Sequence, residues 1–188
     1  MERKLFIKNM VCDRCIKVLE NEINQLGIEL LDIELGSIIY PETDSAQFKN
    51  ISKVIEENGF EVLLAPDQQL VEEIKKELIE LLKKLPLQLE SNLSRFLEQK
   101  LNKEYSKISK LFSNEEHITI EKYFIKLKIE KVKELIQLQE NNFTEISELI
   151  NYSNSNHLSR QFKSETGMSL TDYKKSQKNH RNPLDQIM

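Results

Sequence analysis

The stretch YSNSNHLSRQFKSETGMSLTDY, residues 152–173, decides the fold of this chain. Its apolar residues recur at helical spacing, which predicts one helix at about 154–164 and a second at about 170–177. Leu158 and Phe162 are four residues apart, so we expect both to face the protein core. The stretch therefore predicts two short helices joined by a tight turn.

Upstream of this stretch the sequence stays helical in pattern back to Ala65-Pro66. An apolar stripe runs from Val71 to Leu85 and is closed by Pro86. The segment at about 119–138 has apolar residues along its faces and contains no Gly or Pro, so we expect a rigid spacer between two smaller groups. The further predicted helices lie at about 91–101, 104–113 and 143–150.

A displacement of fifty positions aligns the second half of the chain with itself without a gap. An asparagine precedes each copy, Asn102 or Asn151, and asparagine tolerates the left-handed backbone of a tight turn. A short helix, a turn and a second helix with outward polar residues form the helix-turn-helix pattern, whose second helix fits the DNA major groove. The aligned pairs are Ser109/Ser159, Lys110/Arg160, Phe112/Phe162, Glu115/Glu165, Thr119/Ser169, Tyr123/Tyr173, Ile108/Leu158 and Ile118/Met168.

Residues 152–173 resemble the C-terminal signature of AraC-type transcription regulators in three features. These are the Phe-Lys pair, the Gly four residues after that Lys, and the closing Tyr. Residues 123–132 resemble the linker helix of the family, with Lys128 where Arg is usual. The resemblance covers about 70–177 and implies a double helix-turn-helix domain that binds double-stranded DNA. The departures from the family pattern are Asn102 and Asn151 at the turn glycines, His117 at the first-copy Gly, and Leu170 at the usual Pro.

By position, the resemblance implies recognition helices at about Glu104–Leu111 and Ser155–Gln161. Arg160 can donate two hydrogen bonds to a guanine edge and Asn156 could read adenine, whereas lysines suit phosphate anchoring. His157 lies beside this surface and is either a contact or simply exposed. The alternative is that these positions are ordinary solvated side chains on a helical bundle that binds protein. The DNA-binding candidates are Ser106, Lys107, Ser109, Lys110, Ser155, Asn156, Ser159, Arg160 and Lys163.

The N-terminal sixty residues alternate strand and helix patterns. The order is strand, helix, strand, strand, helix, strand, which is the ferredoxin-like split βαβ arrangement with both helices on one face of an antiparallel sheet. The whole chain is therefore expected to be α+β, with a ferredoxin-like domain at 1–66, a double helix-turn-helix domain at 67–178 and a flexible tail at 179–188. The predicted elements are strands at 5–7, 31–35, 38–40 and 60–64, and helices at about 16–26 and 48–58.

Cys12 and Cys15, the only two cysteines, lie between the first strand and the first helix. The dipole and free N–H groups of a helix N-terminus favour thiolates there. Two close thiolates without a histidine in the first hundred residues suit a soft metal at low coordination, such as Cu(I). A tetrahedral zinc site would need two more ligands, which this domain lacks unless a second molecule supplies them. We expect Met10 to be a buried prop of the loop and not a ligand.

Together with the strand and helix order, residues 9–15 and Asn58-Gly59-Phe60 resemble the heavy-metal-associated domains of copper chaperones and metal pumps. The resemblance covers about 3–65 and implies metal binding by the cysteines. The chain departs from that family at Asn9, Asp13 and Arg14. Two alternatives stay open, a domain kept for packing, dimerisation or partner binding, and thiol redox chemistry.

Charge differs between the two halves of the chain. Residues 1–100 carry 13 Lys and Arg against 19 Asp and Glu, whereas residues 101–188 carry 14 against 12. This small positive excess gives slight support to nucleic-acid binding. No segment approaches the roughly 20 apolar residues of a membrane span, and no long apolar run follows the basic start. We therefore expect a cytoplasmic protein without a membrane partner.

The leading hypothesis is a transcription regulator whose N-terminal domain senses Cu(I) or another thiophilic metal and whose C-terminal half binds DNA. We expect no enzyme, because the sequence contains no catalytic constellation. The first alternative is a metal chaperone or adaptor whose helical half docks a protein. The second is a regulator that does not respond to metal and whose first domain only forms a homodimer.

Overall fold

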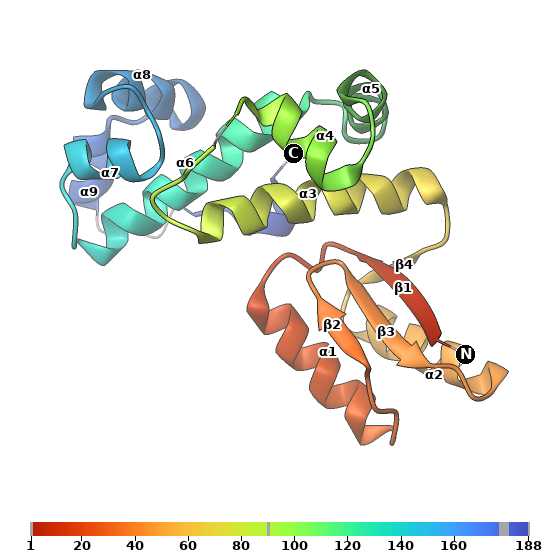
Figure 1. Cartoon of the computed structure of the whole chain (residues 1–188). Helices are drawn as coiled ribbons and strands as arrows, with labels where there is room; N and C mark the ends of the chain where they lie inside the picture. The colour runs from red at the N-terminus through yellow and green to blue at the C-terminus, as the bar shows by residue number, and fades with distance from the viewer. Residues whose placement is uncertain (1, 90, 177–180, 188) are drawn as a thin grey trace. The chain divides into compact units, whose positions relative to one another are not determined.

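The computed structural model describes residues 2–89, 91–176 and 181–187 (Figure 1). The chain consists of two compact units, Met1–Lys76 and Glu77–Met188, and the division falls inside one helix, α3 (Pro66–Lys83). The boundary predicted from sequence lies ten residues earlier, where α3 begins. The first unit contains the sheet and the second is helical, so the expected α+β class is confirmed.

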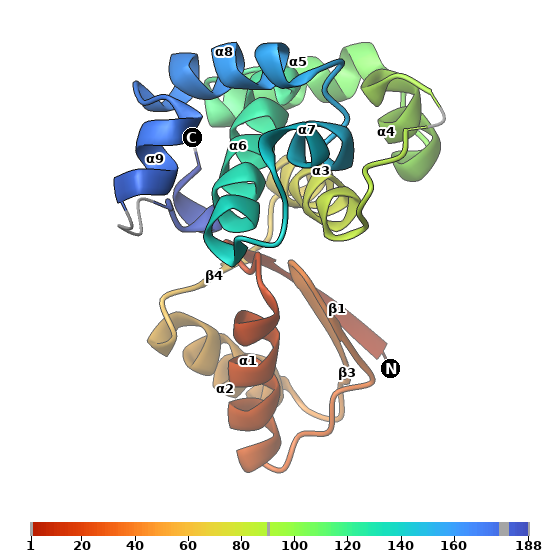
Figure 2. The same ribbon diagram turned by 90° about the vertical axis from the view of Figure 1, so that its left-hand side faces the viewer.

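The first unit has the expected strand and helix order. Its four-stranded sheet has the order β2-β3-β1-β4, and every neighbouring pair is antiparallel. Both helices cover the same side of the sheet (Figure 2). The elements are β1 (Glu2–Lys8), α1 (Asp13–Gln25), β2 (Asp32–Glu34), β3 (Ser37–Pro41), α2 (Ser45–Glu57) and β4 (Glu61–Leu63).

The core of the first unit follows from the alternation along its strands. Leu5 and Ile7 of β1 are buried, and Leu5 lies opposite Ile38 of β3. Helix α1 supplies Leu19 and Ile23 at helical spacing, and α2 contributes its own apolar stripe to the same cluster. Each helix thus buries one face against the sheet, which is why two short helices suffice for this layer.

The second unit consists of helices that surround one long central helix, α6. Its elements after α3 are α4 (Leu93–Leu101), α5 (Tyr105–Glu116), α6 (Ile120–Leu138), α7 (Phe143–Leu149), α8 (Ser155–Thr166), α9 (Leu170–Ser176) and the short 3-10 helix η1 (Leu184–Gln186). The N-terminal half of α6 buries Ile120, Tyr123 and Leu127. Its C-terminal half buries Val132 and Ile136 in a cluster that also holds the apolar residues of α7, α8 and α9. Helix α6 therefore joins two small groups, as its sequence predicts.

The fifty-residue repeat is a structural repeat as well. Helices α5 and α8 begin and end fifty positions apart, and so do the starts of α6 and α9. In each copy a phenylalanine contacts a tyrosine with ring centroids 5.4 Å apart, Phe112 with Tyr123 and Phe162 with Tyr173. The next helix is capped by a hydroxyl in both copies, as the Lys122 N–H donates to Thr119 Oγ1 at 3.2 Å and the Asp172 N–H donates to Ser169 Oγ at 3.1 Å.

The residues that depart from the glycine pattern of the family still adopt the required backbone. Asn102 has φ 50° and Asn151 has φ 56°, at the turns that precede α5 and α8. His117 ends α5 with φ 58°, and its repeat partner Gly167 ends α8 with φ 74°. These substitutions therefore keep the left-handed turn geometry, at the steric cost that a side chain brings there.

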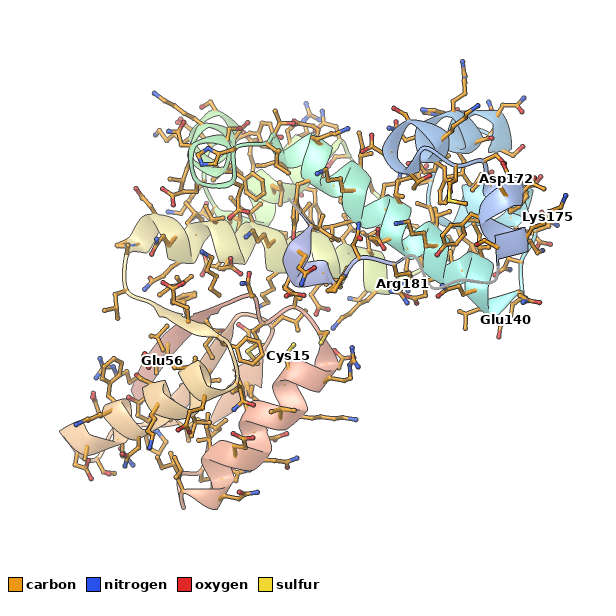
Figure 3. The ribbon with its side chains drawn as sticks, turned by 180° about the vertical axis from the view of Figure 1, so that it is seen from behind. Cys15, Glu56, Glu140, Asp172, Lys175 and Arg181 are labelled. Atoms are coloured by element: carbon orange, nitrogen blue, oxygen red, sulfur yellow. The ribbon has the colours of Figure 1, made fainter. Side chains whose placement is uncertain are left out.

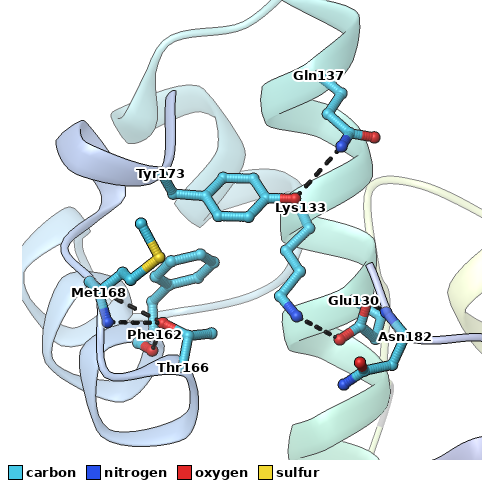
Figure 4. A network of polar contacts seen from close by, with 8 residues as sticks. All are labelled: Glu130, Lys133, Gln137, Phe162, Thr166, Met168, Tyr173 and Asn182. Carbon is cyan, nitrogen blue, oxygen red and sulfur yellow. Dashed lines mark hydrogen bonds and ion pairs between the residues drawn. The ribbon is translucent and has the colours of Figure 1, made fainter. Parts of the chain in front are cut away.

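Residues 181–187 contact the C-terminal half of α6 (Figure 4). The Asn182 N–H donates to Glu130 Oε2 at 2.9 Å, and the same carboxylate accepts from Lys133 Nζ at 2.6 Å. Arg181 Nη2 lies 3.0 Å from Glu134 Oε2. The described part of the predicted flexible tail therefore contacts α6, because Glu130 and Glu134 of that helix bind Asn182 and Arg181. Residues 179, 180 and 188 of that prediction lie outside the described residues.

The matched helix ends permit a direct test of backbone strain. Gly167→Ala is expected to lower the free energy of unfolding by about 1 kcal/mol, because a Cβ disfavours the left-handed backbone. No atom lies within 4 Å of the added Cβ, so this cost is conformational and not a clash. His117→Ala is the control, with an expected loss under about 0.5 kcal/mol, since histidine already carries a Cβ. Urea unfolding of the full chain, followed by circular dichroism, measures both, and equal losses would contradict the explanation.

Candidate nucleic-acid interface and cysteine loop

Helix α8 has one buried and one exposed face. Leu158 and Phe162 are fully buried in the core. The start of the helix is capped by Asn154, whose Oδ1 accepts from the His157 N–H at 2.9 Å. The exposed face carries polar and basic side chains at helical spacing, namely Asn156, His157, Arg160, Lys163 and Ser164. Among the predicted contact residues of this helix, Ser155 and Ser159 are only partly exposed.

Helix α5 presents the equivalent face in the first copy. Ser106, Lys107 and Lys110 are exposed, whereas Ser109 is partly buried. Lys107 Nζ lies 3.2 Å from a carboxylate oxygen of Glu104, the residue that precedes the helix. This pair neutralises part of the positive charge at the start of α5, and two solvated side chains make it weak.

The two exposed faces differ in charge. Helix α8 contains Arg160 and Lys163 against one carboxylate, Glu165. That carboxylate is paired with Lys122 Nζ of α6 at 2.7 Å. Helix α5 contains two lysines against two glutamates, and a third glutamate precedes it. Helix α8 therefore offers the more electropositive surface to a polyanion.

Helices α5 and α8 lie on the same side of α6 in both ribbon views (Figures 1 and 2). Each is the second helix of its helix-turn-helix unit, preceded by α4 and α7 respectively. The structure thus brings the two helices that carry the predicted contact residues to one side of the second unit. A straight duplex offers two major-groove segments to one side of a protein, one helical turn apart.

The fifty-residue repeat indicates that His157 occupies a contact position. A displacement of fifty positions pairs it with Lys107, and both are exposed on their helices. The His157 Nδ1 atom lies 3.2 Å from Ser153 Oγ, and its ring meets the Tyr152 ring edge-on with centroids 5.1 Å apart. His157 is therefore oriented by its neighbours on the same face as Asn156 and Arg160.

The ring of Tyr152 packs between His157 and Lys128. Lys128 Nζ of α6 lies 4.0 Å from the centroid of the Tyr152 ring, a cation–π contact across the core of the second copy. Burial lowers the pKa of Lys128 to about 8, because the charged form loses hydration there. Burial, with a smaller contribution from Glu165, raises the pKa of Tyr152 to about 12. Lys128, which stands where the AraC-type pattern has Arg, thus supports the turn that leads into α8.

The cysteine loop lies at the start of α1, where Figure 3 labels Cys15. Cys12 is the residue that precedes the helix, and its Sγ is 2.9 Å from the Sγ of Cys15. Both side chains are partly exposed. Met10 is 1% exposed and packs in the core of the first unit, as expected for a prop of the loop.

The two thiols have different acidities. Burial opposes ionisation of Cys12, but the Cys15 thiol and the amide groups of Cys15 and Arg14 outweigh it and lower the pKa of Cys12. Burial and the adjacent Cys12 raise the pKa of Cys15. The Cys12 thiol is therefore more readily ionised than the Cys15 thiol.

The donor set of this loop fits a soft ion at low coordination number. Two sulfur atoms on one side of a short loop suit Cu(I), which accepts few thiolate ligands. Within residues 2–89, 91–176 and 181–187, no group of three or more His, Cys, Asp or Glu side chains is placed to hold a metal ion. A four-ligand zinc site is accordingly not formed by the described part of this chain.

None of the helices in the described ranges is long and apolar enough to cross a membrane. No curated protein and no solved structure matches the chain. A family model described as a helix-turn-helix domain matches residues 97–176, which run from α4 through α9 and contain both copies of the repeat. Residues 97–176 are therefore similar to helix-turn-helix domains of the AraC type, a class that serves DNA-binding transcription regulation.

Proposed function

We propose that this chain regulates transcription by binding a specific double-stranded DNA sequence with α5 and α8 in successive major-groove segments. The observation that carries the proposal is the repeat itself. Two helix-turn-helix units share one central helix, and their second helices lie on the same side of it with polar, solvent-exposed faces. Double-stranded DNA is a partner that repeats its surface once per helical turn, as two such units require.

In this proposal α8 is the principal reader of bases. Arg160 is exposed on α8 and can form two hydrogen bonds with a guanine edge, and Asn156 lies one turn earlier with an amide suited to adenine. Lys163, one turn later, supplies a phosphate contact. Helix α5, with its balanced charge, adds Ser106, Lys110 and Lys107 as a weaker second set of contacts.

We further propose that Cys12 and Cys15 bind Cu(I) and that the bound ion modulates DNA binding. Support comes from two neighbouring thiols at a helix N-terminus, where thiolates are favoured. The ion would tie the loop between β1 and α1 to the first turn of α1, since Cys12 ends the loop and Cys15 lies in that turn. Thiol redox chemistry and a purely structural or dimer-forming first unit are the competing roles for this loop.

Substitutions in α8 are expected to separate base reading from phosphate binding. Sequences selected from random DNA by the full chain define its site. Arg160→Ala is expected to cost about 1–3 kcal/mol at that site, roughly 5- to 150-fold in affinity, and to relax the preference at one base pair. Lys163→Ala is expected to weaken all sequences alike and to reduce the slope of log affinity against log salt by about 1.

The control for both substitutions is Lys53→Ala, which removes an exposed lysine of α2 that pairs only weakly with Glu57. It makes the same change in net charge and is expected to leave DNA binding unchanged. If the parent chain selects no preferred sequence, the proposed function is wrong, and tight Cu(I) uptake in that case would favour the chaperone or adaptor alternative.

The metal proposal predicts that Cys12→Ser/Cys15→Ser loses Cu(I) binding, measured by competition with a chromophoric Cu(I) chelator. Met10→Leu is the matched control, because it keeps the buried volume and removes a sulfur atom that we do not expect to be a ligand. DNA affinity with and without Cu(I) completes the experiment. A change in the parent that the double variant does not show supports sensing, whereas equal behaviour of the two proteins rejects it.

A further inference from the structure

Two adjacent residues in the first turn of α6 each contact one of the two recognition helices. Glu121 accepts a hydrogen bond from the hydroxyl of Tyr105, the first residue of α5. Lys122 Nζ lies 2.7 Å from Oε1 of Glu165, in the last turn of α8. Successive residues of a helix point about 100° apart, so neighbours can reach elements on different sides of α6.

The Lys122–Glu165 pair differs from the other exposed ion pairs of this chain in its surroundings. The Glu165 side chain is only 9% exposed, whereas that of Lys122 is 47% exposed. Glu165 Oε1 also accepts from Gln161 Nε2 at 3.1 Å, which fixes its position along α8. A carboxylate that is largely withdrawn from water and held by a second hydrogen bond is more ordered than a solvated surface pair.

The contact between Tyr105 and Glu121 is a hydrogen bond from a hydroxyl to a carboxylate. Burial and the adjacent carboxylate raise the pKa of the Tyr105 hydroxyl. Burial opposes ionisation of Glu121, but the hydrogen bond from Tyr105 outweighs it and lowers the pKa of that carboxyl. Both shifts favour a neutral hydroxyl that donates to an ionised carboxylate at neutral pH.

These contacts break the symmetry of the repeat. The position equivalent to Lys122 in the second copy is Asp172, whose carboxylate accepts from Ser169 Oγ at 2.6 Å within its own helix cap. The position equivalent to Glu165 in the first copy is Glu115, on the exposed side of α5. The aromatic pairs of the two copies match, Phe112–Tyr123 and Phe162–Tyr173, whereas the polar contact with Lys122 joins one copy to the other. Lys122 and Glu165 are 43 positions apart in sequence.

We infer that the Lys122–Glu165 ion pair, together with the Tyr105–Glu121 hydrogen bond, sets the spacing of the two DNA half-sites that this chain accepts. The inference rests on the proposed DNA-binding function. Half-sites on successive major-groove segments are one turn of about 10–10.5 base pairs apart. One extra base pair therefore moves a half-site by about 3.4 Å along the axis and rotates it by roughly 35°. A fixed angle between α5 and α8 cannot follow that displacement.

Lys122 and Glu165 act in this inference as positioning residues and need no contact with DNA. The test uses the full chain and the DNA site that it selects, with one base pair inserted or deleted between the two half-sites. The parent is expected to lose at least about tenfold in affinity for either altered site, in the range of one defective base-pair contact. Lys122→Met and Glu165→Gln are expected to keep the original affinity within about threefold and to lose less than about threefold at the altered sites.

The charge-reversed variant Lys122→Glu/Glu165→Lys is expected to restore the tenfold discrimination, because it restores the pair with opposite polarity. Lys53→Met is the matched control, since it removes a lysine charge from α2 and leaves both contacts of α6 in place. Tyr105→Phe removes only a hydroxyl and tests the second contact. If circular dichroism shows that a single charge variant does not fold, Tyr105→Phe and the charge-reversed variant are used in its place.

Several outcomes separate this inference from the function on which it rests. A parent that selects no DNA defeats the proposed function. A parent that binds selected DNA and tolerates the altered spacing, or variants that keep its full discrimination, defeat the inference alone. If Lys122→Met weakens every site equally and lowers the salt dependence by about 1, Lys122 is a phosphate contact and the inference is also wrong.

Discussion

The second unit depends on the burial of both halves of α6, each in its own small core. A surface helix of a globular protein buries one stripe, whereas α6 buries residues on several faces, including Tyr123 and Leu127 in one half and Val132 and Ile136 in the other. Each half serves as the central helix of a different small core. The two helix-turn-helix units are too small to bury their apolar faces alone, so each depends on its half of α6.

This sharing has a consequence for the positions of the recognition helices. Phe112 of α5 packs against Tyr123 of α6, and Phe162 of α8 packs against Tyr173 of α9, with the same ring separation in both copies. Apolar packing of this kind resists separation of the helices and is less specific about rotation, since dispersion contacts carry little directional preference. Polar contacts such as Lys122–Glu165 are directional and can therefore restrict the rotation of the helices.

The modest charge of the helical unit makes placement of cations more important than their number. Several lysines are engaged inside the unit, as with the buried pair Lys133–Glu130 and the contact of Lys128 with Tyr152. The exposed side of α8 keeps Arg160 and Lys163, while its carboxylate is turned toward α6. A locally basic helix can thus exist in a chain whose net charge is negative.

The sequence by itself determined the order of the elements, the α+β class and the two copies of the helical unit. Hydrophobic periodicity is a local property, so the stripes of α1, α6 and α8 and the apolar run of β1 were visible without a structure. Only the tertiary structure decided that the equivalent positions Lys107 and His157 are exposed with different partners, that residues 181–187 contact α6, and that Lys122 reaches Glu165. Those features depend on side chains that are distant in sequence, and their pairing is set by how helices pack and not by any local pattern. The backbone of Asn102, Asn151 and His117 shows the same division, since the sequence located the turns and the folded chain held non-glycine residues in the left-handed conformation.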